Sequence, residues 1–198
     1  MKITRIVNSV FTSNTFVLTD ETSPYVWLVD VGDIDPILEV VGEKEVKGVF
    51  ITHTHYDHIY GVNRLVERFP ECAIYTSIHG KEGLFSSKLN FSKYHDDPLT
   101  FQGKYVEVLE DGEEVSLFPF VILKAVATPG HDWSCMSYCT DEVIFTGDSY
   151  IPNIKVVTSM PKSNKEEAKV SLDRILELAK TKDVYPGHNE IVYRSSPR

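Results

Sequence analysis

Cysteine is scarce in this sequence, and its positions exclude several kinds of site. The cysteines are odd in number, and no two of them form a C-x-x-C pair: Cys72, Cys135 and Cys139. Zinc knuckles and dithiol redox sites depend on such pairs, and disulfide-stabilised secreted domains use even numbers of cysteines. We therefore expect the thiols to be reduced and to lie in the core of a cytoplasmic protein.

Long hydrophobic runs and blocks of positive charge are also missing. No stretch approaches the roughly 18 consecutive apolar residues of a membrane span, and the N-terminal segment has no apolar run before a small-residue cleavage site. A net charge of −9 without a basic block disfavours nucleic acid as a partner, because phosphate binding needs a basic face. The sequence also has no G-x-S-x-G serine motif. We expect a soluble, cytoplasmic protein with neither a nucleic acid nor a membrane as partner.

The chain is long enough for a substantial core. Its 198 residues, 42% of them hydrophobic, predict one domain, residues 1–198. β-rich and apolar runs predict strands over 2–10, 14–20, 25–32, 46–52, 120–131, 135–149 and 183–189, the first three antiparallel. Helices are predicted over 35–43, 59–69 and a segment that follows a capping-box pattern of Ser163 and Glu166. Asp111-Gly112 predicts a hairpin between its flanking strands, and residues 79–103 look irregular.

Four polar motifs each follow an apolar run, and one of them is dense in histidine. The segment THTHYDH holds His53, His55, Asp57 and His58, and the others are TPGH with His131, TGDS with Asp148 and YPGH with His188. Strand ends are where layered α/β proteins build their sites. Side chains two apart in an extended segment share a face, so His53 and His55 can hold one ion, while the following turn directs Asp57 and His58 toward a second. Imidazole and carboxylate ligands without cysteine favour a divalent first-row metal over a structural thiolate site.

These motifs together resemble the metallo-β-lactamase superfamily. Its order H-x-H-x-D-H, Gly-His, T-G-D and P-G-H is matched from Thr52 to His188. The resemblance implies an α/β fold, an αββα four-layer sandwich with a metal cleft along one edge. It implies that one metal is held by His53, His55 and His131, the other by Asp57, His58 and His188, with Asp148 bridging both. Asp30, in LVDVG, resembles an aspartate that supports the ligands without binding metal.

The branch most similar is glyoxalase II, which hydrolyses acyl-glutathione thioesters. The resemblance implies a hydrolase of a thioester or related activated ester that uses a bridging hydroxide between two divalent metals, with Asp57 and Asp148 as catalytic residues. Zinc is the favoured metal, and iron or manganese also suits these ligands. The segment after Asp148 lacks the Gly-Cys-Gly-Lys/Arg run of glyoxalase II, and only ten residues follow His188. We therefore expect no glutathione-binding C-terminal domain and a different small-molecule substrate.

Other classes within the superfamily remain as alternatives. A mononuclear-iron persulfide dioxygenase holds its iron with the counterparts of His53, His131 and Asp148 and keeps the other ligand positions. Lactonase and phosphodiesterase are lesser alternatives, because the fold hosts both activities. Asp148 disfavours the zinc β-lactamases, which usually have cysteine or serine at this position. His55 disfavours the diiron oxygen reducers, which usually have glutamate there. A non-catalytic metal-binding module is disfavoured because proteins that lose catalysis tend to lose ligands.

Several residues beside the motifs could contact a substrate. Tyr56, Tyr60, Tyr150 and Lys155 lie close to candidate ligands in sequence, although we expect most of them to pack or face solvent. Asp132 and Trp133 replace the small and polar Thr-Pro-Gly that often follows the third histidine in the superfamily. The sequence leaves open whether Trp133 fills the core or lines the cleft.

Overall fold

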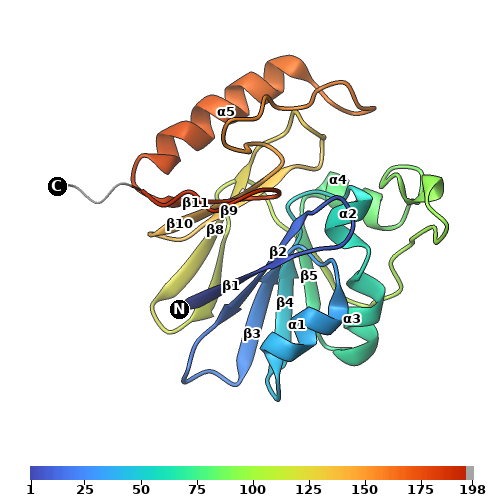
Figure 1. Cartoon of the computed structure of the whole chain (residues 1–198), viewed down its shortest axis with the longest axis vertical. Helices are drawn as coiled ribbons and strands as arrows, with labels where there is room; N and C mark the ends of the chain where they lie inside the picture. The colour runs from blue at the N-terminus through green and yellow to red at the C-terminus, as the bar shows by residue number, and fades with distance from the viewer. Residues whose placement is uncertain (195–198) are drawn as a thin grey trace.

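Two β-sheets form the centre of the protein, which a computed structural model describes over residues 1–194 (Figure 1). The first sheet has the order β1-β2-β3-β4-β5-β6 and the second the order β11-β10-β9-β8-β7. The strands of the first are Lys2–Val7, Asn14–Thr19, Tyr25–Val29, Glu45–Phe50, Ala73–Thr76 and Val106–Val108, in chain order from β1 to β6. Those of the second are Glu114–Phe118, Val121–Ala127, Met136–Cys139, Val143–Gly147 and Asp183–Pro186, in chain order from β7 to β11.

Helices cover the outer face of each sheet. Helix α5 lies over the second sheet, and the shorter helices lie beside the first (Figure 1). The helices are α1 (Ile34–Val41), α2 (Tyr56–Ile59), α3 (Val62–Arg68), α4 (Ile78–Leu84), a 3₁₀ turn η1 (Ser92–Tyr94) and α5 (Lys165–Ala179). None of the helices in residues 1–194 combines the length and the apolar character needed to cross a bilayer.

Three separate apolar clusters hold these layers together. In β2, Phe16 and Leu18 belong to the cluster between the sheets, whereas Val17 belongs to the cluster under α1 and α3. This alternation follows from the two-residue period of a strand, and both faces are buried because the sheet is covered on both sides. A third cluster, with Ile144 and Ile175, lies between the second sheet and α5. Three cores between four layers confirm the expected αββα sandwich.

The first three strands confirm the predicted antiparallel arrangement, but the predicted hairpin is wrong. Strand β6 pairs in parallel with β5, and β7 pairs with β8 in the other sheet. The turn at Asp111-Gly112, where Gly112 has a φ of 89°, therefore carries the chain from one sheet to the other. Asp111-Gly112 does form the predicted turn. A turn involves only four residues, however, and does not determine which strands the flanking segments pair with.

Two further sequence expectations need correction. Residues 135–149 form two strands, β9 and β10, which pair antiparallel. Helix α5 is capped by Asn164, whose side chain accepts hydrogen bonds from the backbone N–H groups of Glu166 and Glu167. Ser163, the predicted cap, instead donates its hydroxyl to the carbonyl of His131. A tertiary contact has thus taken the side chain that the local pattern favoured.

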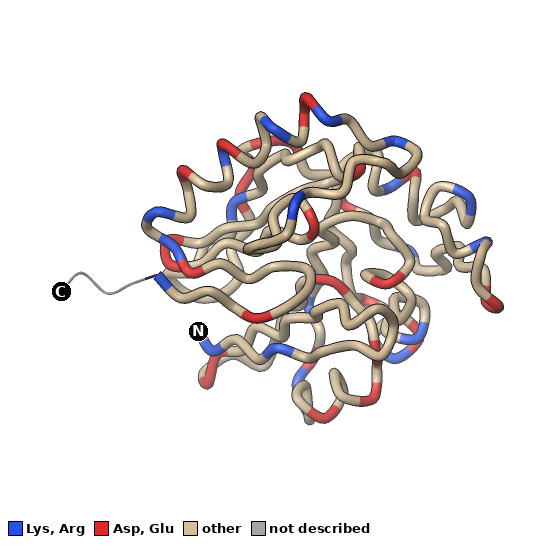
Figure 2. The backbone as a smooth tube through the Cα atoms, turned by 45° about the horizontal axis from the view of Figure 1, so that its top comes forward, with Lys and Arg blue, Asp and Glu red and all other residues tan. Residues whose placement is uncertain are grey.

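The cysteines lie in the core, and charges of both signs are interleaved along the chain. All three cysteines are free thiols and buried. Figure 2 shows basic and acidic residues interleaved along α5 and along the loops of both sheets. The expectations about nucleic acid and cellular location stay predictions.

Candidate metal centre

The predicted ligands lie together at one edge of the sandwich, where strands of both sheets end. His53 follows β4 of the first sheet, while His131, Asp148 and His188 follow β8, β10 and β11 of the second. Most of these groups are buried, with Asp148 and His188 14% and 17% exposed in their side chains. The two sheets thereby supply rigid supports on opposite sides of one site.

The local structure of the HTHYDH segment explains how it contributes four side chains. Residues 53–55 follow β4 without regular secondary structure, and His55, the residue before α2, is extended with φ −62° and ψ 144°. Asp57 and His58 lie in that short helix and are buried. The change from extended to helical backbone directs the first two imidazoles and the last two groups to neighbouring positions, as the sequence predicted.

Three overlapping groups of side chains could each hold a cation. Within each group the potential ligand atoms lie within 4.8 Å of one another. The groups are His53, His55 and His131; Asp57, His58 and His188; and His53, His58 and Asp148. The first two correspond to the two ligand sets that the resemblance implied, and the third links them through Asp148.

Unsatisfied buried atoms show that this cluster suits a metal ion. Nε2 of His53, Nε2 of His58 and Oδ1 of Asp148 are buried and have no hydrogen-bond partner. Buried polar atoms are nearly always paired, so such a concentration requires an explanation. A divalent cation would be bound by these lone pairs, and the donor set of imidazole and carboxylate fits zinc, iron or manganese.

Neighbouring charges set the charge states of the cluster, and two of its imidazoles differ from the metal-binding form. Burial, followed by the nearby His58, holds the pKa of His53 well below its usual value, so its imidazole is neutral. Burial alone would raise the pKa of Asp57, but His58 and His188 outweigh it and hold the pKa well below its usual value. Burial alone would lower the pKa of His188, but Asp148 and Asp57 raise it to about 9. Burial alone would lower the pKa of His58, but Asp57 and Asp148 outweigh it and hold the pKa well above its usual value. Neutral imidazoles and ionised carboxylates are the metal-binding forms, so the protons on His58 and His188 must leave when a metal binds.

The outward ring nitrogens of three imidazoles meet hydrogen-bond acceptors. Nδ1 of His58 lies 2.9 Å from Oδ2 of Asp30, and Nδ1 of His131 lies 2.9 Å from the carbonyl oxygen of Val157. Nδ1 of His53 lies 3.2 Å from the hydroxyl of Thr52, which in turn donates to Asp30. Such contacts fix ring orientation and leave Nε2 free for a metal. Asp30 thus contacts a candidate ligand, as the resemblance implied.

The weaker sequence candidates have mostly structural partners. The ring of Tyr56 stacks on His95 with centroids 4.0 Å apart, and the Tyr60 hydroxyl donates to Asp33 at 2.6 Å. Tyr150 packs against the cluster beneath α5. Lys155 is exposed and lies with His131 and Asp148 around a small cavity, so it shares that cavity with two candidate ligands.

Two contacts at the site were missed in the sequence. The ring of Phe91 lies 5.0 Å from that of His55, and Phe91 adopts a left-handed backbone with φ 61°. Nothing in the irregular 79–103 segment identifies Phe91, because its contact depends on how that segment folds back. The other contact is made by Asp132, whose position beside His131 was visible in the sequence but whose partner was not.

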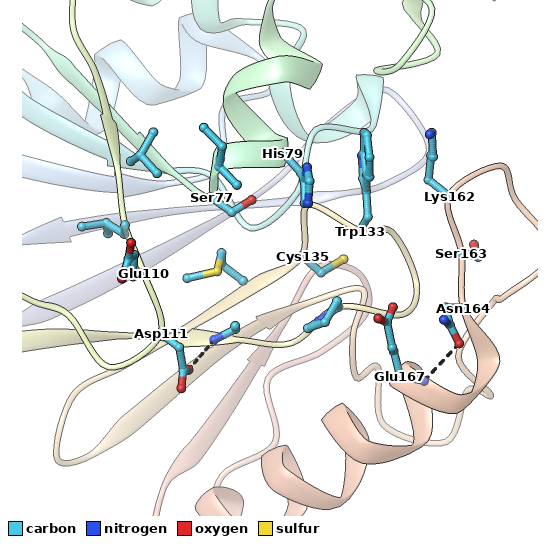
Figure 3. A pocket seen from close by; sticks show the side chains of 16 residues that line it. Ser77, His79, Glu110, Asp111, Trp133, Cys135, Lys162, Ser163, Asn164 and Glu167 are labelled. Atoms are coloured by element: carbon cyan, nitrogen blue, oxygen red, sulfur yellow. Dashed lines mark hydrogen bonds between the residues drawn. The ribbon is translucent and has the colours of Figure 1, made fainter.

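A cavity of about 630 Å³ lies next to the segment that follows His131 (Figure 3). Its walls include Trp133, Cys135 and Met136 from that segment, His79 from α4, and Glu167 from α5. The volume lies in the range of small-molecule sites, and a ligand there would be adjacent to the segment carrying the candidate ligands.

Comparison with known proteins gives a consistent family. The matching family model is that of the metallo-beta-lactamase superfamily, over residues 13–188. A probable metallo-hydrolase of Streptococcus pyogenes serotype M6 is 29% identical, over 95% of this chain and 84% of that protein. A hydroxyacylglutathione hydrolase of Pseudoalteromonas translucida is 28% identical, over 67% of this chain and 44% of that protein. This chain therefore matches less than half of the second relative.

Solved structures show the same fold. The BLEG-1 B3 metallo-β-lactamase superposes with a TM-score of 0.86 at 21% identity, covering 96% of this chain and 93% of that one. ETHE1 from Myxococcus xanthus superposes with a TM-score of 0.75 at 26% identity, covering 96% of this chain and 76% of that one. With the fold, the motif order and the family match in agreement, this chain belongs to the metallo-β-lactamase superfamily.

Proposed function

We propose that this protein is a metal-dependent hydrolase with a dinuclear site that cleaves a thioester or a related activated ester. The observation that carries the proposal is the position of Asp148 between the two ligand sets. Its Oδ2 lies 3.7 Å from Nε2 of His131 and 3.5 Å from Nε2 of His188, while Oδ1 lies 3.5 Å from Nε2 of His58. One carboxylate faces imidazoles of both sets, which is the arrangement that a bridging ligand requires.

The proposed ligand assignment uses all seven predicted residues. His53, His55 and His131 would hold one cation, Asp57, His58 and His188 the other, and Asp148 both. Bound divalent cations would supply hydroxide at neutral pH, by lowering the pKa of a bound water to about 7, and would polarise the substrate carbonyl. Zinc is the favoured metal, and iron or manganese would also fit the ligands.

The protein's own groups orient the reaction. Oδ2 of Asp57 lies 3.3 Å from Nε2 of both His58 and His188, so the carboxylate balances cationic charge at the site. Asp57 and Asp148 would also accept the hydrogen bond that fixes the attacking oxygen. No thiol competes as nucleophile, because burial raises the pKa of Cys72 to about 12 and that of Cys135 well above its usual value.

The substrate class is inferred from the relatives and from one departure. The match to a hydroxyacylglutathione hydrolase supports acyl transfer to water from a thioester. The missing Gly-Cys-Gly-Lys/Arg run after Asp148 argues that the thiol part is not glutathione. We therefore propose an acyl thioester or similarly activated ester whose leaving group differs from glutathione.

Metal content and a substrate panel test the proposal. Protein purified without added metal or chelator should hold close to two metals per chain, and should hydrolyse acyl thioesters faster than lactones or phosphodiesters. Turnover of phosphodiesters alone would overturn the substrate class. A single iron, retained when His58 and His188 are replaced, with oxygen consumption on a persulfide, would instead establish the dioxygenase reaction.

A further inference from the structure

Asp132 is a buried carboxylate to which the proposed reaction assigns no role. The residue is 2% exposed, and its Oδ1 accepts hydrogen bonds from the backbone N–H and the hydroxyl of Ser134, at 2.9 and 2.5 Å. Its Oδ2 faces Nε2 of His55 at 3.6 Å. Within residues 1–194 this is the one ion pair that Asp132 makes. A buried carboxylate is unfavourable unless it is paired, so His55 is the group that accounts for its presence.

The orientation of the His55 ring determines which of its nitrogens carries a proton. Nδ1 of His55 lies 3.1 Å from Nε2 of His131, so Nδ1 faces the centre of the three-histidine set. A neutral imidazole that binds a cation through Nδ1 carries its hydrogen on Nε2. Nε2 of His55 is buried, and in the described part of the chain no acceptor lies within hydrogen-bond distance of it. Oδ2 of Asp132 is an acceptor that faces this nitrogen at 3.6 Å.

His55 differs in this respect from the other imidazoles with described outer contacts. His53, His58 and His131 turn Nδ1 outward, toward a hydroxyl, a carboxylate and a carbonyl respectively. His55 turns Nε2 outward, and the acceptor comes from the residue that follows His131. The 3.6 Å separation is longer than a hydrogen bond, and contacts of this kind tighten when the metal or substrate is bound.

From this geometry we infer that Asp132 is a positioning residue, which accepts the Nε2–H of His55 and holds that ring with Nδ1 toward the metal. The inference rests on the metal site proposed above. An anionic acceptor also makes an imidazole a stronger ligand than a neutral acceptor does. Asp132 would therefore strengthen metal binding by the three-histidine set and leave the other set unaffected.

The surrounding contacts keep Asp132 in place. Ser134, which binds Oδ1 of Asp132, also accepts a hydrogen bond from the Thr54 N–H at 3.3 Å and, through its carbonyl, from the Ser77 hydroxyl at 2.9 Å. Trp133 lies between His79 and Lys162, which places one partner on each ring face (Figure 3). The segment that carries Asp132 is thus held by contacts to loops of both sheets.

Zinc binding by three proteins tests the inference: wild type, Asp132→Ala and Asp132→Asn. Competition with a chelator should show that the alanine variant binds zinc at the three-histidine set about 10- to 100-fold more weakly, with the second set unchanged. Asp132→Asn keeps an oxygen for the two Ser134 hydrogen bonds but turns an NH₂ donor toward Nε2 of His55, so it should fold normally and still weaken zinc binding at the three-histidine set. Asp173→Ala removes an exposed carboxylate from α5 and serves as the charge control.

A spectroscopic measurement separates positioning from general loss of structure. In zinc-loaded wild type, the ¹⁵N-imidazole spectrum should show His55 with its proton on Nε2 and protected from exchange with water. That protection should be lost in Asp132→Ala, while the signals of His58 stay unchanged. Failure of wild type to bind zinc would overturn the metal site itself. Two bound zinc ions with equal affinity in wild type and Asp132→Ala, and an unchanged His55 signal, would overturn the role of Asp132 alone.

Discussion

Nδ1 of His58 lies 2.9 Å from Oδ2 of Asp30, and both side chains are buried within the edge of the sandwich. Asp30 also accepts hydrogen bonds from the backbone N–H and the hydroxyl of Thr52, at 2.7 and 2.8 Å. One carboxylate therefore joins the segment after β3 to the start of the histidine motif. The backbone of Asp30 has a φ of 57°, a left-handed conformation that aspartate tolerates better than most residues.

Replacing Asp30 should weaken both the fold and the site. In Asp30→Ala the buried His58 and Thr52 groups lose their acceptor, which should lower the free energy of unfolding by about 3–5 kcal/mol. Urea denaturation of metal-free protein measures this loss. Asp35→Ala is the control, because Asp35 pairs with Arg64 at the surface, where such a pair contributes less than about 1 kcal/mol. Equal losses in the two variants would contradict the role assigned to Asp30.

Asp57→Asn should reduce turnover far more than it reduces stability. The amide keeps the shape of the side chain but removes the negative charge near His58 and His188. Loss of a carboxylate that orients the attacking oxygen should lower kcat by about 10²-fold. Steady-state kinetics on the best thioester, with metal content measured on the same samples, gives the comparison. Asp96→Asn, an exposed position, is the matched control, and wild-type kcat in Asp57→Asn at full metal content would exclude the proposed role.

Proton release on metal binding should depend on His188. Its pKa of about 9 in the metal-free protein lies above the 6.5 of an unperturbed histidine, so the proton stabilises the folded state below pH 6.5. That stabilisation is lost as the pH rises from 6.5 through 9, and over the same range a metal no longer has to displace the proton. Zinc affinity should therefore rise with pH over this window. Titration calorimetry at pH 7.5 in buffers of different ionisation enthalpy should show proton release in wild type and less of it in His188→Ala.

The fold was largely predictable because its strongest signals are periodic. Strand runs such as 25–32 predicted the elements, and the polar motifs after strands predicted the edge on which the site lies, whereas the four layers were implied by the resemblance to the superfamily. The pairing of β6 and β7 with strands of different sheets was not predictable from Asp111-Gly112, since a turn motif is local and sheet pairing is decided by distant strands. The cap of α5 is Asn164 and not the predicted Ser163 for a similar reason, because the Ser163 hydroxyl donates to the distant carbonyl of His131.

The candidate ligands of the site were predictable from the sequence, but the groups that orient their rings were not. The seven candidate ligands were identified from spacing and from a resemblance, and the structure brings them within reach of one another. The groups that hold their rings are less visible in sequence. The Val157 carbonyl that faces His131 can come from any residue type, and Asp132 is a surface-type residue until the fold places it against His55. Backbone acceptors and long-range contacts of this kind leave no periodic pattern.

Gly187 offers a way to disturb the proposed second metal set without replacing any ligand. A Cβ added there would lie 2.3 Å from Oδ1 of Asp148 and 2.9 Å from Cε1 of His58. Both distances are too short for nonbonded atoms, so Gly187→Ala should displace the Asp148 carboxylate.

We expect that variant to hold less than two metals per chain and to lose most of its activity, with metal analysis and kinetics as the measurements. Gly42→Ala is the control, because a Cβ there meets no atom within 4 Å and its φ of 61° only adds backbone strain of about 1–2 kcal/mol. That control should keep its metal. Full metal occupancy and turnover in Gly187→Ala would show that Asp148 does not need the position the structure gives it, and the bridging role would have to be abandoned.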